Sequence, residues 1–391
     1  MLPGHSHPPL TDGNCGFIDP TPLMRAELPV LASLRSGGDV HPAHLGRSTL
    51  ERMPKWLICV PLTLQWLWLA LRYRSLTLPS AANPAITSGG LVGEGKLEYF
   101  EGMGPVARAA TANYCAVSTR CIPTGAELRR LMRRAVLFFP LVAKPDLGLC
   151  GYGVRRLANM GELQAYLAAF PADETVVLQT YLPQEGEAGI FYARDPGAGV
   201  GRIIGLALRH YPQVTGDGTS TVAELMARDP RAARAGNSAL HNCRHDSGRI
   251  PVAGEVVRLA TIGSTRVGGL YRDGGAYITP QLTAAVDAIA RDMPDFHFGR
   301  FDVRFDTLPE LSAGRGFTIM EINGAGSEAI QAWDPDIGLV AALKVIFQKQ
   351  SLLFVIGDAM RGRGVRPVGL VKLIQLNLRQ NRLIARYPPS N

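Results

Sequence analysis

Two segments in the last quarter of the chain, in which polar and apolar side chains alternate, constrain its fold more than any other feature. The first begins at Arg300 and carries Arg300, Asp302 and Arg304 on one face of an extended strand, with only apolar residues on the other. The second ends with Glu321 and Asn323 on one face. If the two strands pair as a hairpin, two carboxylates, an amide oxygen and two guanidinium groups meet in one patch.

This combination of side chains predicts a magnesium site. Carboxylate and amide oxygens suit Mg²⁺, which keeps some of its waters and takes further ligands from phosphates. An arginine beside them can stabilise anionic oxygens that form during a reaction. The alternative is a solvated hairpin face with ordinary ion pairs, and the two strands alone do not exclude it.

Three segments upstream carry features of a nucleotide site. The predicted strand 141–144 ends at Lys144, and the turn 148–154 that follows it is rich in glycine, so that backbone N–H groups can approach phosphates closely. The predicted strand 175–182 precedes Glu187. Its backbone could bond the edge of a purine, and Glu187 could accept hydrogen bonds from ribose hydroxyls. Taken singly, each segment is equally an ordinary turn or a buried strand.

In this order, the segments resemble the ATP-grasp superfamily, specifically carboxylate–amine ligases such as D-alanine–D-alanine ligase and cyanophycin synthetase. The resemblance covers residues 125–345 and implies an α+β ATP-grasp fold, in which two α+β lobes grip ATP. The site residues that it implies are Lys144, Gly151, Gly153, Gln179, Tyr181, Leu182, Glu187 and Arg209 for ATP, Asp302, Glu321 and Asn323 for the metal, and Arg300 for catalysis.

The resemblance also implies a reaction. ATP and Mg²⁺, for which Mn²⁺ could substitute, would activate a small-molecule carboxylate as an acyl phosphate. A nucleophile, expected to be an amine, would then attack while Arg300 stabilises the oxyanion, releasing ADP and phosphate. Two alternatives stay open: an ATP-grasp phosphotransferase that stops at phosphorylation, and a catalytically silent nucleotide-binding module.

The chain departs from these ligases in two places. Residues 324–329, Gly-Ala-Gly-Ser-Glu-Ala, replace a Thr-x-Pro-Gly-like turn after the Glu-x-Asn pair, so we expect a different acceptor side. The basic residue that the family often places before the Gly-Asp-Gly segment at 216–218 could be Arg209 or His210. The N-terminal third does not resemble the usual substrate domain, so the substrate is not carried over by analogy.

We expect five regions along the chain: a loosely ordered leader (1–50), a divergent N-terminal region that could serve the substrate (51–125), a small lobe (126–183), a large lobe with the metal site (184–345) and a basic helical tail (346–391). Residues 75–104 are interpreted as loops. Within them, Gly90–Leu97 matches a P-loop pattern but has Leu97 where a Mg²⁺-binding Ser or Thr is needed. Segment 83–96 is therefore interpreted as a connector or, alternatively, as a substrate loop.

The position of the net charge and the spacing of the cysteines limit the kinds of partner that we expect for this chain. Nine of the 41 basic residues and one of the 33 acidic residues follow Leu343, so the net charge of +8 lies in the tail and the main body is balanced. This argues against a nucleic-acid-binding body. The six cysteines show no metal-like spacing, as expected for reduced thiols in a cytoplasmic protein.

Two segments suggest contact with a membrane surface. The apolar run 56–71 holds three of the four tryptophans between flanking cations, but as a helix its 16 residues would rise only about 24 Å, which is short for a span. On a helix, Lys372, Gln375, Arg379, Arg382 and Arg386 would form a basic stripe beside an apolar face. We predict an enzyme on the cytoplasmic face of a membrane, whose substrate could be lipid-like. The alternative is that both segments dock on the body or on a second subunit of a homodimer.

Overall fold

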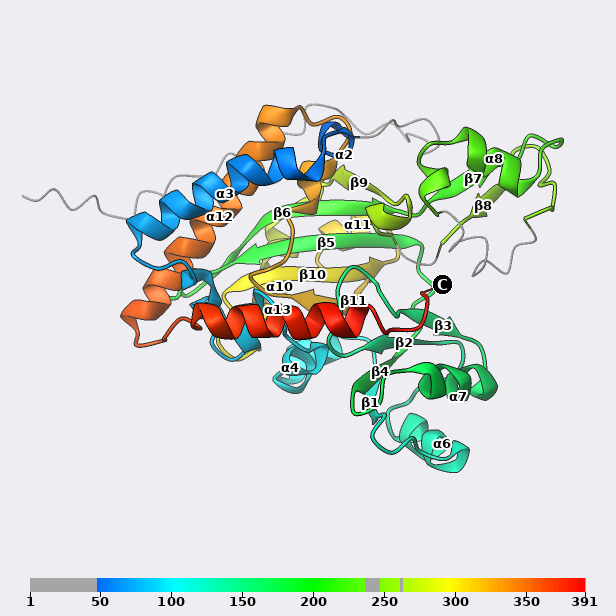
Figure 1. The fold of residues 1–391 in the computed structure, drawn as a ribbon, viewed down its shortest axis with the longest axis horizontal. Coiled ribbons are helices and arrows are strands. Elements are labelled where there is room, and N and C mark those ends of the chain that lie inside the picture. The colour runs from blue at the N-terminus through cyan, green and yellow to red at the C-terminus, as the bar shows by residue number, and fades with distance from the viewer. Residues whose placement is uncertain (1–47, 236–246, 261–262, 391) are drawn as a thin grey trace, which may run out of the picture.

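The structure, a computed structural model, describes residues 48–235, 247–260 and 263–390 (Figure 1). Two mainly antiparallel sheets are each accompanied by helices, which confirms the predicted α+β class. One sheet has four strands in the order β1-β4-β2-β3, and the other has five in the order β11-β10-β5-β6-β9. A separate two-stranded ribbon, β7-β8, projects beside them.

The strands are β1 (Tyr114–Ser118), β2 (Leu141–Pro145), β3 (Arg155–Leu157), β4 (Thr175–Thr180), β5 (Gly186–Ala193), β6 (Arg202–His210), β7 (Gln213–Thr215), β8 (Val256–Arg258), β9 (Leu270–Asp273), β10 (Phe298–Phe305) and β11 (Phe317–Asn323). The α-helices are α2 (Thr49–Arg52), α3 (Lys55–Arg72), α4 (Lys96–Glu101), α5 (Pro105–Ala109), α6 (Gly125–Arg134), α7 (Met160–Ala169), α8 (Val222–Arg228), α10 (Pro280–Arg291), α11 (Leu308–Ser312), α12 (Leu339–Gly362) and α13 (Leu370–Ile384). Short 3₁₀ turns are η2 (Leu78–Ala81), η3 (Thr87–Gly90), η4 (Ala232–Ala235), η5 (Thr265–Val267), η6 (Gly275–Tyr277) and η7 (Ile330–Trp333).

The four-stranded sheet and helices α6 and α7 form the small lobe. Both helices begin at a side-chain cap, Thr124 for α6 and Asn159 for α7, each of which accepts a hydrogen bond from a backbone N–H in the first turn. Their apolar faces pack on the sheet around Leu141, Leu163 and Leu178. The predicted strands 141–144 and 175–182 are confirmed as β2 and β4, although β4 ends at Thr180. Strand β1 also belongs to this sheet, although it precedes the lobe boundary that we placed at residue 126.

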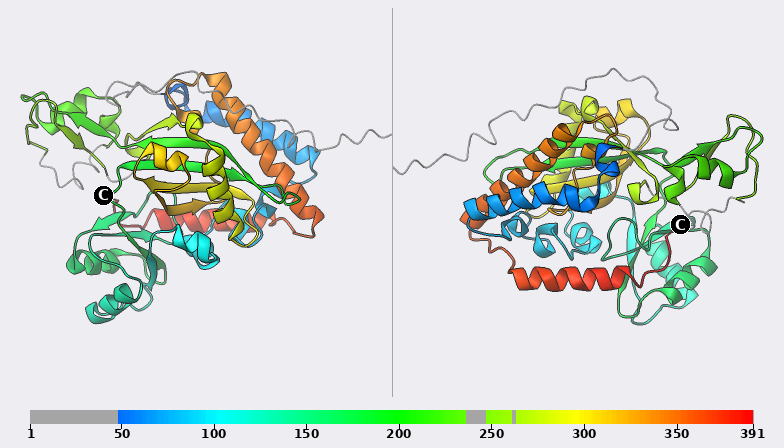
Figure 2. Two further views of the ribbon diagram at one scale, coloured as in Figure 1. Left: turned by 180° about the vertical axis from the view of Figure 1, so that it is seen from behind. Right: turned by 45° about the horizontal axis from the view of Figure 1, so that its top comes forward.

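Side-chain alternation gives the five-stranded sheet two different faces. Ile190, Tyr192, Phe301 and Val303 point to the face covered by helix α10, where they form the largest apolar cluster. The intervening residues of the same strands point to the opposite face, which carries the charged side chains described below. The left view of Figure 2, seen from behind Figure 1, shows helix α10 in front of the sheet. One face of the large sheet is therefore core, and the other carries the charged side chains next to residues such as Phe191 and Ala193, which pack on η7 and α12.

The region predicted as loops, residues 75–104, is largely buried and contains η2, η3 and α4. Asn83 is fully buried and holds this region to the large sheet: its side chain donates to the carbonyl of Phe298 and accepts from the N–H groups of His297 and Phe298. The segment is thus tied to the start of β10, beside the predicted hairpin.

Helices α3 and α12 pack against each other at one end of the large sheet (Figure 1). Helix α12 begins at Leu339, so the predicted tail boundary at 345/346 falls inside it. Among the described residues it is the one helix long and apolar enough to cross a membrane, with a mean hydropathy of 1.7 in its most apolar window. It packs on η2, η7 and α3 through residues such as Leu353, Phe354 and Ile356, and 33% of that apolar window is buried.

The predicted tail helix is confirmed as α13, although Tyr387 lies beyond its end. On the apolar face predicted beside the basic stripe, Leu373 and Leu383 are buried, whereas Leu370 and Ile374 are about half exposed; Gln380, which was not predicted to be buried, is buried as well. Most of the predicted leader, together with Cys15 and Cys243, lies outside the described residues. The four described cysteines, Cys59, Cys115, Cys121 and Cys150, form no disulfide.

Candidate active site

The predicted hairpin is confirmed and forms the floor of a cavity of about 460 Å³ between the two lobes. Strands β10 and β11 pair antiparallel, with Asp302 opposite Glu321 and Arg300 opposite Asn323. All four side chains line the cavity. The register shifts once, directly after Asp302, and pairing then resumes with Val303 opposite Ile319. The pairing is therefore regular where the four cavity side chains meet.

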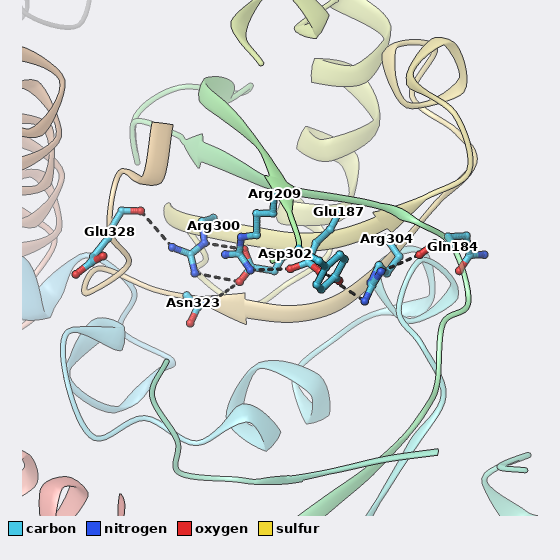
Figure 3. A network of polar contacts seen from close by, with 9 residues as sticks. Gln184, Glu187, Arg209, Arg300, Asp302, Arg304, Asn323 and Glu328 are labelled. Carbon is cyan, nitrogen blue, oxygen red and sulfur yellow. Dashed lines mark hydrogen bonds and ion pairs between the residues drawn. The ribbon is translucent and has the colours of Figure 1, made fainter. Parts of the chain in front are cut away.

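Asp302 is the centre of a buried ion-pair network (Figure 3), with a relative exposure of 1%. Arg300 donates to both of its carboxylate oxygens, at 2.6 Å and 3.0 Å, and Arg209 donates at 2.9 Å. The Asn323 amide donates at 3.2 Å. Burial alone would raise the pKa of Asp302, but the guanidinium groups of Arg209 and Arg300 hold it below its ordinary value. The carboxylate is therefore ionised and fixed in place.

Glu187, on β5, extends the network toward the segment 181–185, which connects β4 of the small lobe to β5 of the large sheet. Its carboxylate is buried and contacts Arg209 at 3.0 Å, Arg304 at 3.5 Å and the hydroxyl of Tyr211. Arg304 in turn donates to the carbonyl of Gln184 at 2.8 Å. Glu187 lines the cavity as predicted for a ribose ligand, although cations and a hydroxyl already engage both of its oxygens.

The structure separates the two candidates for the basic residue on β6. Arg209 points into the cavity and links Glu187 to Asp302. His210 alternates to the other side of the strand, where burial and then the charge of Arg272 lower its pKa. Arg209 is thus the basic residue that can reach a bound anion.

The donor set on the hairpin fits a magnesium ion that keeps several waters. Glu321 is 34% exposed, lines the cavity and forms an ion pair with Lys96 at 3.4 Å. Asn323 also lines the cavity and donates through its amide nitrogen to Asp302, whose oxygens are shared with two arginines and this amide. Two carboxylates and one amide suit a metal that takes its other ligands from phosphates and water. Among the described residues there is no group of three or more His, Cys, Asp or Glu side chains that could hold a metal without such help.

Lys144 lies on the small lobe and reaches across to the hairpin. Its ammonium group donates to the carbonyl of Met320 on β11 and to the side-chain oxygen of Gln179, both at 2.7 Å. Gln179 is itself buried and positions the lysine, in addition to lining the cavity. Burial lowers the pKa of Lys144 to about 7, against the opposing effect of Glu321. The lysine is therefore poised to gain a proton when a polyanion approaches.

The glycine turn covers the cavity with its main chain. Gly151 and Gly153 have positive φ angles of 73° and 72°, which glycine adopts without strain. Four carbonyls in the turn or directly before it accept hydrogen bonds from side chains. Tyr387 donates to Leu147, Gln380 to Gly148, Ser390 to Gly151 and Tyr166 to Gly153. The N–H groups of residues 149–151 have no hydrogen-bond partner among the described residues and are available to an anion.

The hinge after β4 is open to a ligand in the same way. Tyr181 and Leu182 line the cavity, and their main-chain groups hydrogen bond to no other residue in the described part of the chain. The guanidinium of Arg156 lies over the ring of Tyr181, 4.7 Å from its centroid. Free main-chain donors and acceptors on a connecting segment are what a purine edge requires.

Sequence reasoning missed the contribution of segment 91–96. Leu91, Val92, Glu94 and Lys96 line the cavity, and Lys96 is buried beside Glu321. The signal that could have found them is the density of glycine: Gly89, Gly90 and Gly93 all have positive φ. A Cβ on Gly90 would lie 2.6 Å from Gly324 Cα, so glycine is required where this segment meets the hairpin end. Segment 83–96 is therefore part of the site wall and not a plain connector, and it is not a P-loop, because no strand precedes it.

Helix α13, which we interpreted as a membrane-surface helix or, alternatively, as a helix docked on the body or on a second subunit, also borders the site. Asn377, Gln380 and Asn381 line the cavity, and the Gln380 side chain accepts from the N–H of Gly93 while donating to Gly148. The sequence signal was present as four amides, three of them these cavity residues, on a helix otherwise rich in leucine and basic residues.

Comparison with known proteins gives partial structural matches only. No protein-family model and no curated protein matches the chain. Among solved structures, it is similar to a bifunctional glutathione synthetase from Pasteurella multocida, with 18% identity and a TM-score of 0.35 over 59% of this chain and 33% of that one. It is also similar to D-alanine–D-alanine ligase from Bacillus anthracis, with 15% identity and a TM-score of 0.36 over 69% of this chain and 68% of that one. The same ligase complexed with ATP gives 16% identity and a TM-score of 0.35, over 66% of this chain and 65% of that one. The chain thus spans one third of the first of these proteins, and we base its function on the side chains described above.

Proposed function

We propose that the chain is an ATP- and Mg²⁺-dependent ligase of the ATP-grasp type, which activates a carboxylate as an acyl phosphate and joins it to an amine. The observation that carries this proposal is the paired register of β10 and β11, which sets Asp302 against Glu321 and Arg300 against Asn323 in a cavity roofed by Lys144 and a glycine turn. The order of these elements in the chain is that of the family resemblance stated above.

Each group has a distinct proposed role. Glu321, Asn323 and Asp302 would hold Mg²⁺, which neutralises charge on the phosphates when bound. Lys144 and the free N–H groups of the glycine turn would bind the phosphates, and the hinge at 181–182 would bind the purine. Arg300, whose side chain is 11% exposed, lies beside the metal ligands and would stabilise the oxyanion that forms when the nucleophile attacks.

Two cavity carboxylates that form no ion pair with an arginine in the described part of the chain, those of Glu94 and Glu328, favour an amine as the acceptor. Glu94 lines the cavity, and one of its oxygens is buried without a hydrogen-bond partner among the described residues. Burial raises the pKa of this carboxyl to about 7. Glu328, which also lines the cavity, is exposed. An ammonium group would satisfy the unpaired oxygen of Glu94 better than a neutral hydroxyl, because its hydrogen bond is charge-assisted.

The test is turnover with panels of acids and amines. A ligase releases ADP and free phosphate only when Mg²⁺ and both substrates are present. A phosphorylated acid that accumulates without amine dependence would identify a phosphotransferase instead. Nucleotide binding without either product, across a panel that includes acids with alkyl chains, would indicate a silent module.

Nucleotide binding is expected to take up a proton above pH 7. Because the pKa of Lys144 in the free protein is about 7, the lysine is mostly neutral at pH 8, and bound phosphates raise its pKa again. MgATP affinity should therefore fall as pH rises above 7, by up to about tenfold per pH unit. Calorimetry at pH 8 in buffers of different ionisation enthalpy measures the proton uptake directly.

A matched pair of variants assigns the proton. Lys144→Met should abolish the uptake and weaken MgATP binding by roughly tenfold or more, because a charge-assisted contact is lost. Lys344→Met, at an exposed lysine away from the cavity, should change neither. Equal proton uptake in the two variants would show that another group titrates.

A further inference from the structure

Helix α3 exposes a continuous apolar face. Trp56, Val60, Leu64, Leu67, Trp68 and Leu71 have relative exposures between 49% and 80%. Their spacing along the sequence places them within about 120° of one another around the helix axis. The opposite face, with Ile58 and Leu69, is buried against the rest of the protein. We call these six residues the outer face of α3.

The charged residues that flank α3 in the sequence, Lys55, Arg72 and Arg74, are of one sign. Lys55 stands at one end of the helix, and Arg72 and Arg74 stand at the other, all exposed. The guanidinium of Arg72 lies 5.5 Å from the ring centroid of Trp68. No acidic residue occurs between Glu51 and Glu94, and Glu51 is buried in an ion pair with Arg231. Nothing on α3 would therefore repel an anionic surface.

Helix α13 repeats the pattern on the same side of the molecule. Leu370, Val371, Ile374 and Leu378 are 49% to 69% exposed, and no acidic residue follows Asp358. Figures 1 and 2 show α3 and α13 on the side of the large sheet opposite to α10. Both helices thus lie on the same side of the large sheet, and each exposes apolar side chains on a segment that carries basic and no acidic residues.

We propose that the outer face of α3, with the exposed side of α13, docks on the surface of an anionic lipid bilayer without crossing it. Tryptophan is favoured at the level of the lipid headgroups, apolar side chains enter the acyl boundary, and cations bind the anionic headgroups. The flanking cations favour this occupant over a second copy of the chain, because two copies would bring Lys55, Arg72 and Arg74 close to like charges. The proposal does not depend on the ligase activity.

Co-flotation of the full chain with vesicles tests the proposal. The protein should float with phosphatidylcholine vesicles that contain phosphatidylglycerol, much less with pure phosphatidylcholine, and less at high than at low salt. A triple variant, Trp56→Gln, Leu64→Gln and Trp68→Gln, should lower the partition coefficient at least about tenfold, because the apolar area that enters the bilayer is lost. These side chains are exposed, so its Tm and MgATP affinity should stay unchanged.

The matched control is Val200→Gln with Val252→Gln, two valines that are each 68% exposed on other parts of the surface. This variant should float like the parent. A parent that stays at the bottom with anionic vesicles at low salt overturns the proposal. A dimer in light scattering that the triple variant abolishes, without flotation of the parent, would assign the face to a second copy. Flotation of residues 48–391 but not of the full chain would assign it to residues 1–47.

Discussion

Glu321→Gln is expected to lower Mg²⁺-dependent turnover by at least about 100-fold, because a metal ligand of this kind contributes about 3 kcal/mol or more to transition-state stabilisation. The side chain keeps its size and is 34% exposed, so the fold should be unaffected. Measurements of kcat/KM over a range of Mg²⁺ concentrations, together with thermal unfolding, check both parts.

Glu310→Gln provides the control for this substitution. Glu310 lies on α11, in the connection between β10 and β11, and does not line the cavity. The Glu310→Gln variant should turn over substrate at the parental rate. Parental activity in the Glu321 variant would remove the metal site from the hairpin, and equal losses in both variants would point to a general disturbance of the hairpin.

Asp302→Asn is expected to destabilise the protein, whereas Glu321→Gln, at the position opposite it in the hairpin, is not. The Asp302 carboxylate neutralises Arg209 and Arg300, whose side chains are 12% and 11% exposed, and its removal leaves buried positive charge. Breaking a buried ion pair from one side costs about 3–5 kcal/mol. The free energy of unfolding from urea titration should fall by that amount, and activity should be lost as well.

Asp306→Asn is the matched control for stability. Asp306 directly follows β10 and is exposed, so the change should leave the free energy of unfolding within about 0.5 kcal/mol of the parent. If Asp302→Asn is equally stable, Glu187 alone must suffice to neutralise Arg209, and the network is less tightly coupled than its geometry indicates.

The hairpin could be predicted from the sequence because its information is local. Alternation along two short strands fixed which side chains share a face, and the family resemblance, which rests on the order of the segments, indicated Lys144 and the glycine turn. Which of Arg209 and His210 faces the cavity could not be predicted, because a shift of one residue in the register of β6 exchanges the two. Only the pairing of this strand with β5 and β9 decides between them.

The contributions of Lys96 and helix α13 could not be predicted because they depend on contacts between distant parts of the chain. Lys96 is separated from Glu321 by more than two hundred residues, and its role is visible only when Gly90 packs on Gly324. The faces of α13 were partly wrong for a related reason. Hydrophobicity alone does not show that Gln380 is buried together with Leu373 and Leu383. Its side chain is buried because it accepts from the N–H of Gly93 and donates to the carbonyl of Gly148.

The carbonyls held at Leu147, Gly148, Gly151 and Gly153 bear on the entropy of ligand binding. A free glycine-rich turn loses backbone freedom when it closes on phosphates, at about 1–2 kcal/mol per residue fixed. Here Tyr166, Gln380, Tyr387 and Ser390 restrict the turn through its carbonyls before any ligand arrives. Much of that ordering is therefore completed during folding, and the N–H groups meet an anion already preorganised.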